Sequence, residues 1–193
     1  MNMRAATWYA IALAIAGNAF AAAVGTAPLV TAITITFLLF AYTYRLKRVA
    51  FVGNLLVSTM VALAFVFGGV IAMNIIPTLF VALPAFLANT GRELYKTIDD
   101  MAGDKKAGIS SLPVKVGAPR TRLIAALFVL ATVVYSPVPY LLGIFSVAYL
   151  FIVLVADVLF VVSAVAHRRN SLLIKIAMLL VLVAAIAGSV VSF

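Results

Sequence analysis

Residues 75–104 read IIPTLFVALPAFLANTGRELYKTIDDMAGD, a stretch that begins as hydrocarbon and ends in a cluster of charges. Its first part, 75–91, is apolar over a length that can cross a bilayer core as a helix, which takes about 17–25 residues. Its second part, 92–104, holds four of the five acidic residues of the whole chain. Acids beside Lys and Arg, where a membrane span meets a polar loop, are suited to binding a diphosphate through a metal ion. This stretch therefore predicts a membrane enzyme that acts on a phosphorylated, lipid-like substrate.

The composition of the chain places it among membrane proteins. Of its 193 residues, 66% are apolar and only 10% are charged, whereas soluble domains carry about 25% charged residues. The absence of cysteine excludes disulfides and thiolate metal sites, and the single histidine, His167, excludes a multi-histidine zinc site. The net charge of +9 is typical of the basic cytoplasmic loops of a multispan protein. We therefore expect a membrane environment and no nucleic-acid partner.

Long apolar runs predict an all-α bundle of seven transmembrane helices. Each run has about the length of a bilayer span, and the sixth is long enough to tilt or protrude. The runs cover roughly residues 5–24, 28–44, 50–73, 75–91, 121–137, 140–166 and 171–192. No soluble segment, long linker or internal repeat interrupts them, so residues 1–193 are expected to form a single membrane domain.

The basic residues alternate between connections. Lys and Arg residues, fourteen in all, lie near the N-terminus and around the connections that follow the second, fourth and sixth apolar runs. The opposite connections, residues 25–28, 73–77 and 136–139, contain none. Because cytoplasmic loops carry the excess of Lys and Arg, we expect a cell-membrane protein with its N-terminus and its acidic cluster in the cytoplasm.

Residues 1–24 have a second interpretation, a secretory signal, because Arg4 precedes an apolar stretch that ends in three alanines. That stretch is longer than the usual signal core of about 7–15 residues. Its many small residues also suit close packing against another helix in a membrane. We therefore expect residues 1–24 to form the first span.

The charged half of the opening stretch has helical spacing. If the fourth helix continues past the membrane surface, four charged residues recur every four positions on one stripe: Arg92, Lys96, Asp100 and Asp104. Gly103 leaves the last step open, since a glycine there could end the helix before Asp104. Mg²⁺ usually takes one or two carboxylates, with water and substrate phosphates as its other ligands. The residues alone leave two interpretations, a magnesium site and a solvated loop whose acids offset its lysines.

Residues 92–117, RELYKTIDDMAGDKKAGISSLPVKVG, resemble the second aspartate-rich motif of the UbiA superfamily of intramembrane prenyltransferases. The resemblance is specific because it joins Asp100-x-x-x-Asp104 to a downstream Gly-x-x-x-Leu-Pro. Residues 42–48, YTYRLKR, are similar to the tyrosine-plus-basic motif of that superfamily.

Two further segments, 53–58 and 65–69, are similar to the branch of the superfamily that makes archaeal ether lipids. Many relatives carry an acid where Thr97 stands, so this motif has one carboxylate fewer than usual. The first aspartate-rich motif has no counterpart, because residues 1–91 contain no Asp or Glu. The family also usually has nine spans. The sequence therefore resembles a family member without its N-terminal part, and we expect the isolated chain to be nearly inactive.

This resemblance implies a helical bundle around a cavity and a magnesium-dependent prenyl transfer. The group transferred would be geranylgeranyl, from its diphosphate to the hydroxyl of geranylgeranylglyceryl phosphate. Asp100 and Asp104 would be the catalytic, magnesium-binding residues. The candidate substrate-binding residues are Tyr42, Lys47, Arg48, Asn54, Arg92 and Lys96. Phe65, Phe67 or Phe86 could stabilise an allylic cation through a ring face, with ordinary packing as the alternative.

Other functions stay open on the sequence alone. Within the superfamily, the acceptor could instead be an aromatic quinone precursor or a haem precursor. Outside it, a transporter component or a non-catalytic membrane protein is possible. Asp157 lies about 15 Å along a helix from His167 and hence near the middle of the bilayer. We expect it to form a structural hydrogen bond, with a partner among four polar residues: Asn18, Asn54, Asn89 and Ser163.

Overall fold

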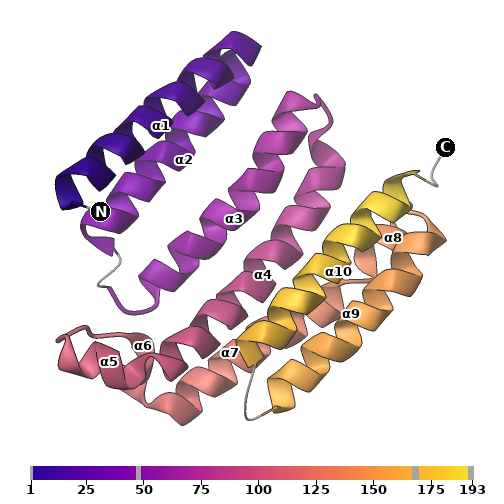
Figure 1. Cartoon of the computed structure of the whole chain (residues 1–193). Coiled ribbons are helices and arrows are strands. Elements are labelled where there is room, and N and C mark those ends of the chain that lie inside the picture. The colour runs from indigo at the N-terminus through magenta and orange to yellow at the C-terminus, as the bar shows by residue number, and fades with distance from the viewer. Residues whose placement is uncertain (1, 47–48, 167–169, 191–193) are drawn as a thin grey trace.

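The computed structural model describes residues 2–46, 49–166 and 170–190 (Figure 1). The regular structure in these ranges is helical, as predicted. The helices are α1 (Met3–Val24), α2 (Thr26–Tyr44), α3 (Val52–Ile71), α4 (Ile75–Asp99), α5 (Met101–Lys106), α6 (Leu112–Val116), α7 (Ala118–Tyr135), α8 (Val138–Leu141), α9 (Val147–Val165) and α10 (Asn170–Val190). Within the described residues, seven segments are long and apolar enough to span a membrane: α1, α2, α3, α4, α7 with α8, α9 and α10. The predicted number of spans is therefore confirmed.

The predicted run 140–166 is wrong in one respect, because it is broken. α8 ends at Leu141, and α9 begins only at Val147. Between them Gly143 has a φ of +70°, a left-handed conformation that glycine adopts without steric cost. The sixth span is therefore an ordinary 19-residue helix, without the extra length from which tilting or protrusion was expected.

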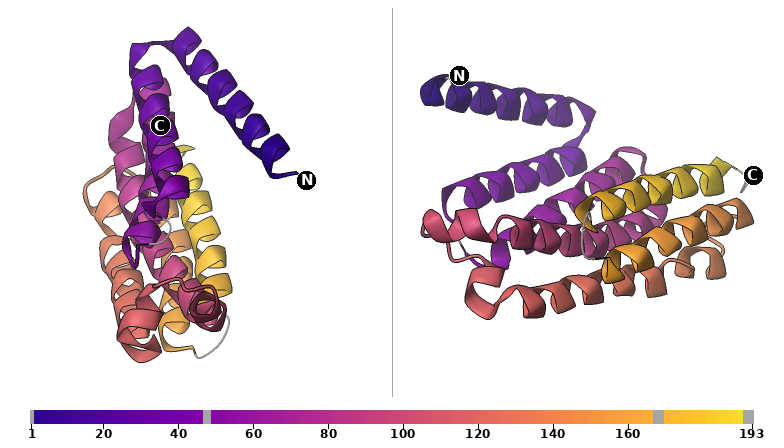
Figure 2. Two further views of the ribbon diagram at one scale, coloured as in Figure 1. Left: turned by 90° about the vertical axis from the view of Figure 1, so that its left-hand side faces the viewer. Right: turned by 60° about the horizontal axis from the view of Figure 1, so that its bottom comes forward.

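Four helices form the core of the bundle. α4 packs on α7 and α10, and α9 packs on both α7 and α10. Their contact faces bury alanine, branched aliphatic and aromatic side chains, including Ala88, Leu94, Tyr95, Ala125, Val129, Ala156, Phe160, Ile174 and Ala177. On the other side α4 packs against α3, which in turn contacts α2. α1 packs on α2 at the edge of the molecule and splays away from the core (Figure 2).

The outward faces of the spans are apolar. Trp8 of α1 is 71% exposed, and Phe37 of α2 and Phe151 of α9 are each 68% exposed. Such side chains favour contact with lipid, while the helices satisfy their backbone hydrogen bonds internally. Together with the seven apolar helices, they indicate a multi-pass membrane protein.

α4 has 25 residues, so its length of about 38 Å exceeds a bilayer core of about 30 Å. Its last turns can therefore project beyond the membrane surface. Gly91 lies just before these turns and lets α4 approach α7 closely. A Cβ atom there would lie 2.6 Å from Cγ2 of Val129 and 2.9 Å from the carbonyl oxygen of Ala125. The glycine therefore determines how the charged end of α4 is placed against α7.

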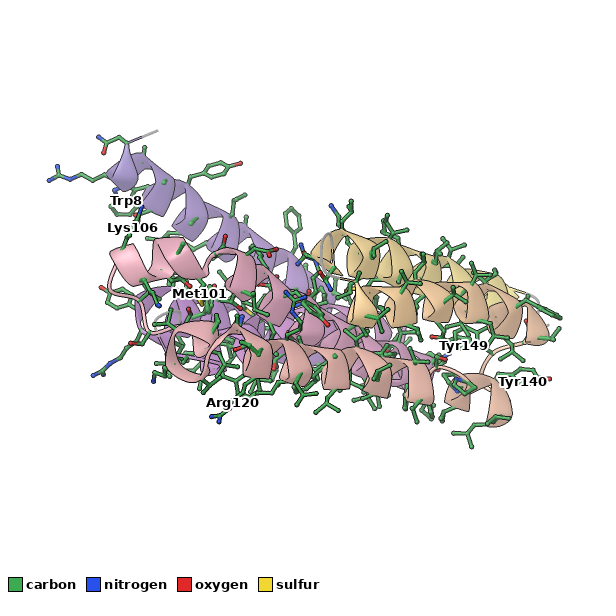
Figure 3. The ribbon with its side chains drawn as sticks, turned by 90° about the horizontal axis from the view of Figure 1, so that it is seen from below. Trp8, Met101, Lys106, Arg120, Tyr140 and Tyr149 are labelled. Atoms are coloured by element: carbon green, nitrogen blue, oxygen red, sulfur yellow. The ribbon has the colours of Figure 1, made fainter. Side chains whose placement is uncertain are left out.

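The two ends of the bundle differ in character. Met101 and Lys106 of α5 lie with Arg120 of α7 at one end, and Tyr140 and Tyr149 lie toward the other (Figure 3). We call the first the charged end, because the last turns of α4, α5, α6 and the start of α7 meet there. The acidic cluster is thus assembled at a single end of the molecule.

Candidate active site

The acidic stripe keeps its helical spacing beyond the end of α4. The backbone amide of Asp100 donates to the carbonyl oxygen of Lys96 over 3.0 Å, and the amide of Asp104 donates to the carbonyl oxygen of Asp100 over 3.0 Å. Gly103 therefore does not end the helix, and Asp104 lies within α5. The chain turns instead at Gly108, whose φ is +67°. Asp100 and Asp104 are thus one helical turn apart.

A cavity of about 460 Å³ opens beside this stripe at the charged end. The end of α2, the loop before α3, the first turns of α3, the end of α4, α5 and the segment before α6 all contribute to its wall. Its lining residues are Tyr42, Thr43, Tyr44, Arg45, Val49, Ala50, Gly53, Asn54, Val57, Glu93, Lys96, Thr97, Asp100, Asp104, Ile109 and Ser111. Five of the predicted site residues line this one cavity: Tyr42, Asn54, Lys96, Asp100 and Asp104. Lys47 and Arg48 lie outside the described residues.

The two aspartates face the cavity without a cationic partner in the described part of the chain. The ion pair found there joins Arg92 to Glu93, and neither Asp100 nor Asp104 takes part in one. In those same ranges no group of three or more acidic, His or Cys side chains is gathered to hold a metal. A pair of carboxylates one turn apart fits Mg²⁺, which commonly completes its ligands with water and phosphate oxygens. The donor set therefore suits a magnesium ion that arrives with a phosphorylated substrate.

Arg92 does not line the cavity, although it belongs to the predicted stripe. Its Nη1 atom donates to Oε1 of Glu93 over 2.7 Å. Residues four apart on a helix drift by about 40° per step, because each residue turns about 100°. Over the twelve positions to Asp104 this drift reaches about 120°. The role of Arg92 in binding substrate stays a prediction.

Asn54 and Thr97 join the two helices that form one side of the cavity. Nδ2 of Asn54 on α3 donates to Oγ1 of Thr97 on α4 over 3.4 Å. The Thr97 hydroxyl in turn lies 2.7 Å from the carbonyl oxygen of Glu93, which accepts its hydrogen bond. Thr97 thus contributes a hydroxyl that links α3 to α4.

Sequence reasoning missed several polar residues of the lining, among them Arg45, Glu93 and Ser111. Arg45 belongs to the tyrosine-plus-basic segment and Glu93 to the acidic cluster, so both could have been chosen from those patterns. A single serine before Leu-Pro carries no such signal. Ser111 reaches the cavity only because the chain reverses after α5.

A residue with a positive φ holds the loop before α3. Phe51, which precedes α3, has a φ of 67°, and a bulky residue in this region needs support from its surroundings. Its ring lies 6.3 Å from the ring of Phe128 on α7, with the planes tilted by 50°. This contact anchors the loop whose Val49 and Ala50 line the cavity.

A second, much smaller cavity of about 40 Å³ lies deeper in the bundle. It is apolar and is bounded by side chains from α3, α4, α7, α9 and α10. Phe65 lines it, whereas Phe67 and Phe86 do not. The suggested interaction of these rings with an allylic cation stays a prediction.

Asp157 lies outside the large cavity and is 7% exposed. As predicted it forms a hydrogen bond within the bundle, but the expected partners were wrong. The hydroxyl of Ser136, at the end of α7, lies 2.5 Å from Oδ2 of Asp157 and donates to it. The hydroxyl of Tyr149 donates to the carbonyl oxygen of Ser136 over 2.8 Å. The sequence could not reveal Ser136 because the two residues are brought together only by the packing of α7 against α9.

Comparison with known proteins points to one family. The chain is 37% identical over 141 residues to a digeranylgeranylglyceryl phosphate synthase from Methanosphaera stadtmanae, a match that covers 73% of this chain and 52% of the relative. It is 34% identical over 197 residues to one from Methanococcoides burtonii, covering 98% of this chain and 70% of the relative. The chain spans about half the length of several relatives, at 52%, 56% and 57% for three of them.

A solved structure from work on digeranylgeranylglyceryl phosphate synthase in membranes has the same fold. The TM-score is 0.86 at 30% sequence identity, and the match covers 98% of this chain and 71% of that chain. The model of the UbiA prenyltransferase family matches residues 1–183, which is most of the sequence. The chain therefore belongs to the UbiA prenyltransferase family.

Proposed function

We propose that this chain builds the magnesium-diphosphate site of a geranylgeranyl transferase of archaeal ether-lipid synthesis. The reaction transfers the geranylgeranyl group from its diphosphate to the hydroxyl of geranylgeranylglyceryl phosphate. The observation that carries this proposal is the pair Asp100 and Asp104, one helical turn apart and without an ion pair among the described residues, in a cavity that also holds Lys96. The names of the relatives, which match at 32–37% identity, support the choice of substrates.

Different lining residues would bind the metal ion and the diphosphate group of the substrate. Asp100 and Asp104 would hold the magnesium ion. When bound, the ion would act as a Lewis acid that stabilises the charge on the departing diphosphate. Lys96 and Arg45 place positive charge in the same cavity and would balance the diphosphate oxygens that the metal does not reach. The hydrogen bond between Asn54 and Thr97 keeps α3 and α4 in register around the headgroup.

The orientation follows from the charge distribution. The charged end carries the Lys and Arg residues of α4, α5 and α6, and cytoplasmic loops carry the basic excess. We therefore infer that the charged end faces the cytoplasm of the cell membrane, where water-soluble Mg²⁺ is available. We expect the seven spans to act as a single membrane domain, because each of them packs against a neighbouring span.

The identity of the acceptor substrate distinguishes this proposal from its main alternative. In that alternative, an enzyme of the same family prenylates an aromatic acceptor. The test uses membranes that contain this chain joined to the N-terminal region of a relative that supplies the first aspartate-rich motif. Mg²⁺ and geranylgeranyl diphosphate are added, with geranylgeranylglyceryl phosphate and 4-hydroxybenzoate as competing acceptors. We expect the glyceryl ether phosphate to gain a second geranylgeranyl chain and the aromatic ring to stay unmodified. Prenylation of the ring alone, detected by mass spectrometry of the extracted lipids, would overturn the choice of acceptor.

A further inference from the structure

Two cations near the charged end, Arg92 and Lys175, lie outside the large cavity. Arg92 is in the last part of α4, and Lys175 is in the second turn of α10. The two helices pack against each other (Figure 1). Neither residue belongs to the wall of the large cavity, so the magnesium site does not account for them.

Arg92 belongs to the face of α4 that lines the small apolar cavity. Ala85 and Ala88 line this cavity, and Arg92 follows them by seven and four positions. At about 100° per residue, Arg92 is turned by about 20° from Ala85 and by about 40° from Ala88. Glu93, in the wall of the large cavity, is turned by about 140° from Ala88. Arg92 therefore lies on the same face of α4 as the small cavity, one turn closer to the charged end.

Lys175 occupies the matching position on α10. Met178 and Leu182 of α10 line the same small cavity, and Lys175 precedes them by three and seven positions. It is therefore turned by about 60° from Met178 and by about 20° from Leu182. Lys175 is exposed, and it is the one charged residue in the sequence of α10. An ionisable side chain within a membrane span usually finds a polar partner or extends to the interface.

Arg92 and Lys175 lie at similar depths in the bundle. The Tyr95 hydroxyl of α4 donates to the carbonyl oxygen of Ala164 over 3.4 Å. The Asn170 side chain, at the start of α10, donates to two carbonyl oxygens at the same end of α9, so Tyr95 and Asn170 are level with each other. From this level Arg92 is three residues and Lys175 five residues into the bundle, or about 4.5 Å and 7.5 Å at 1.5 Å per residue.

Both side chains keep hydrogen-bond donors for a ligand. Lys175 forms no ion pair or hydrogen bond within the described part of the chain. The Arg92 side chain is 26% exposed, and its Nη1 atom donates to Oε1 of Glu93 over 2.7 Å. Its Nε atom is buried, but a guanidinium has further N–H donors. Nη2 has no partner among the described residues and is not one of the buried atoms without a partner, so a ligand can reach it.

The ligand that fits this arrangement is a lipid with a phosphate headgroup. Two cations at similar depths match a phosphate monoester, which carries close to two negative charges at neutral pH. Hydrogen bonds between charged partners are stronger than neutral ones. The cavity deeper in the bundle is apolar, and its volume of about 40 Å³ takes a short part of a hydrocarbon chain. The rest of the chain would lie in the bilayer along apolar side chains of α10 such as Leu179, which is 55% exposed.

We propose that Arg92 and Lys175 bind the phosphate of the acceptor lipid, geranylgeranylglyceryl phosphate, and that the small apolar cavity receives part of its isoprenoid chain. This inference rests on the proposed function, which supplies the identity of the acceptor. It makes Arg92 and Lys175 the substrate-binding residues of a second headgroup site, next to the site for magnesium diphosphate.

The position of this second site suits the reaction. Arg92 and Lys96 are on successive turns of α4, about 6 Å apart along the helix axis, and Lys96 lines the large cavity. Glu93, which also lines that cavity, forms the ion pair with Arg92. The hydroxyl of the acceptor is only a few bonds away from its phosphate. An acceptor held through its phosphate at Arg92 would therefore present this hydroxyl toward the prenyl diphosphate in the large cavity.

Removing either positive charge should weaken the binding of the acceptor lipid. Lys175→Gln and Arg92→Gln should each lower the affinity for geranylgeranylglyceryl phosphate by about tenfold, because a charge-assisted hydrogen bond is lost. The affinity for geranylgeranylglycerol, which has no phosphate, should stay the same. Lys175→Arg keeps the charge and should remain within about threefold of the original chain. Lys175→Gln breaks no contact of the described residues, so it tests the site even if Arg92→Gln destabilises the fold by removing the ion pair with Glu93.

Arg120 offers a matched control. It is an exposed cation at the charged end, in the first turn of α7, and it lines neither cavity. Arg120→Gln therefore removes one positive charge from the same end of the molecule, away from the site, and should leave the affinity for the acceptor lipid unchanged. Ala85→Leu tests the part of the site that receives the chain. It fills the small cavity and should lower the affinities for geranylgeranylglyceryl phosphate and geranylgeranylglycerol by the same factor.

The experiment is a binding titration of the purified full chain in a nonionic detergent, followed by microscale thermophoresis. The ligands are geranylgeranylglyceryl phosphate, geranylgeranylglycerol and dioleoylphosphatidylglycerol. Weaker binding of the first ligand by about tenfold in Lys175→Gln, with Arg120→Gln unchanged, would support the proposal. Equal affinity of Lys175→Gln and the original chain would overturn it, as would the same loss in Arg120→Gln. Binding of dioleoylphosphatidylglycerol as tight as that of the acceptor lipid would also overturn it, because the site would then belong to bulk anionic lipid.

A parallel titration with inorganic diphosphate plus Mg²⁺ separates this inference from the proposed function. Lys175→Gln should leave the binding of magnesium diphosphate unchanged, whereas Asp100→Asn should abolish it. If Asp100→Asn has this effect and Lys175→Gln does not weaken the binding of the acceptor lipid, this inference fails and the proposed function stands. If the original chain binds neither the acceptor lipid nor magnesium diphosphate, both fail.

Discussion

The amide of Asp104 donates a hydrogen bond to the carbonyl oxygen of Asp100 over 3.0 Å. This bond carries the helical spacing across the point where α4 ends at Asp99 and α5 begins at Met101. As a result both carboxylates lie on the wall of one cavity, where Lys96 also lies. The proposed metal-binding geometry therefore depends on a helix that continues in register beyond the bilayer-spanning part of α4.

The contact between Asp157 and Ser136 should matter for stability rather than for catalysis, because both residues lie outside the cavity. Asp157→Ala should lower the free energy of unfolding by about 1–3 kcal/mol, since it leaves the Ser136 hydroxyl without its partner and opens a small void. Asp157→Asn keeps a polar partner and should lose less. Thermal unfolding in detergent measures both variants, and Val158→Ala, at a residue 62% exposed on the same helix, serves as the control. An Asp157→Asn variant that is stably folded but unable to transfer prenyl groups would contradict the structural role.

Gly91 should be sensitive to a single added methyl group. Gly91→Ala places a Cβ atom 2.9 Å from the carbonyl oxygen of Ala125, a backbone atom that cannot move aside easily. We expect a loss of about 1–3 kcal/mol in stability from overpacking. Gly17→Ala is the matched control, because nothing lies within 4 Å of the added atom. That control should be neutral or stabilising by up to about 1 kcal/mol, since alanine favours helix. Similar stability of the two variants would show that α4 and α7 do not pack as described.

Thr97 should respond to the return of a carboxylate. Thr97→Asp would add a third acid to the cavity that holds Asp100 and Asp104, and the Asn54 amide could still donate to it. We expect Mg²⁺ to bind about tenfold more tightly, because added negative charge favours a divalent cation. Titration with Mg²⁺ alone measures this change, and Thr97→Val, which has a similar shape without the hydroxyl, provides the comparison. An unchanged or weaker affinity in Thr97→Asp would mean that position 97 does not face the metal.

The orientation of the spans can be tested by cysteine labelling, because the chain has no cysteine of its own. Single cysteines at Lys105 and Arg120 should react with an impermeant reagent from the cytoplasmic side, where basic loops are retained. Cysteines at Gly25 and Asn74 should react from the opposite side. Labelling of Lys105 and Asn74 from the same side of sealed vesicles would contradict the topology.

The number of spans could be predicted from the sequence because length and apolar character alone define a bilayer-crossing helix. The break after α8 could not, since its residues are as apolar as a span and only the left-handed Gly143 reveals the turn. The lining of the cavity was predicted only in part, because the sequence shows local spacing but not tertiary packing. Asp100 and Asp104 share a local helical spacing that the sequence displays. Ser111 comes from a segment that returns to the cavity through tertiary packing, and no local pattern encodes that.

The helical spacing also explains why Arg92 does not line the cavity, although it belongs to the predicted stripe. A repeat of four residues looks like a single face over one or two turns, and Lys96, Asp100 and Asp104 do line the same cavity. The drift of about 40° per step accumulates over three steps, so Arg92 is turned away from that space. It pairs with Glu93 instead. The four-residue spacing therefore predicted the cavity-lining positions correctly from Lys96 to Asp104, but not at Arg92.

The most direct test of the magnesium site is the rate of prenyl transfer from geranylgeranyl diphosphate to geranylgeranylglyceryl phosphate at saturating Mg²⁺, measured with this chain joined to the N-terminal region of a relative that supplies the first aspartate-rich motif. Asp100→Asn and Asp104→Asn should each reduce the rate by at least about a hundredfold, because an amide cannot supply the negative charge that holds the metal on the leaving diphosphate. Asp99→Asn is the matched control, since Asp99 is exposed and does not line the cavity, and it should retain most of the activity. Near-normal rates in both Asp100→Asn and Asp104→Asn would contradict a metal-binding role for this pair.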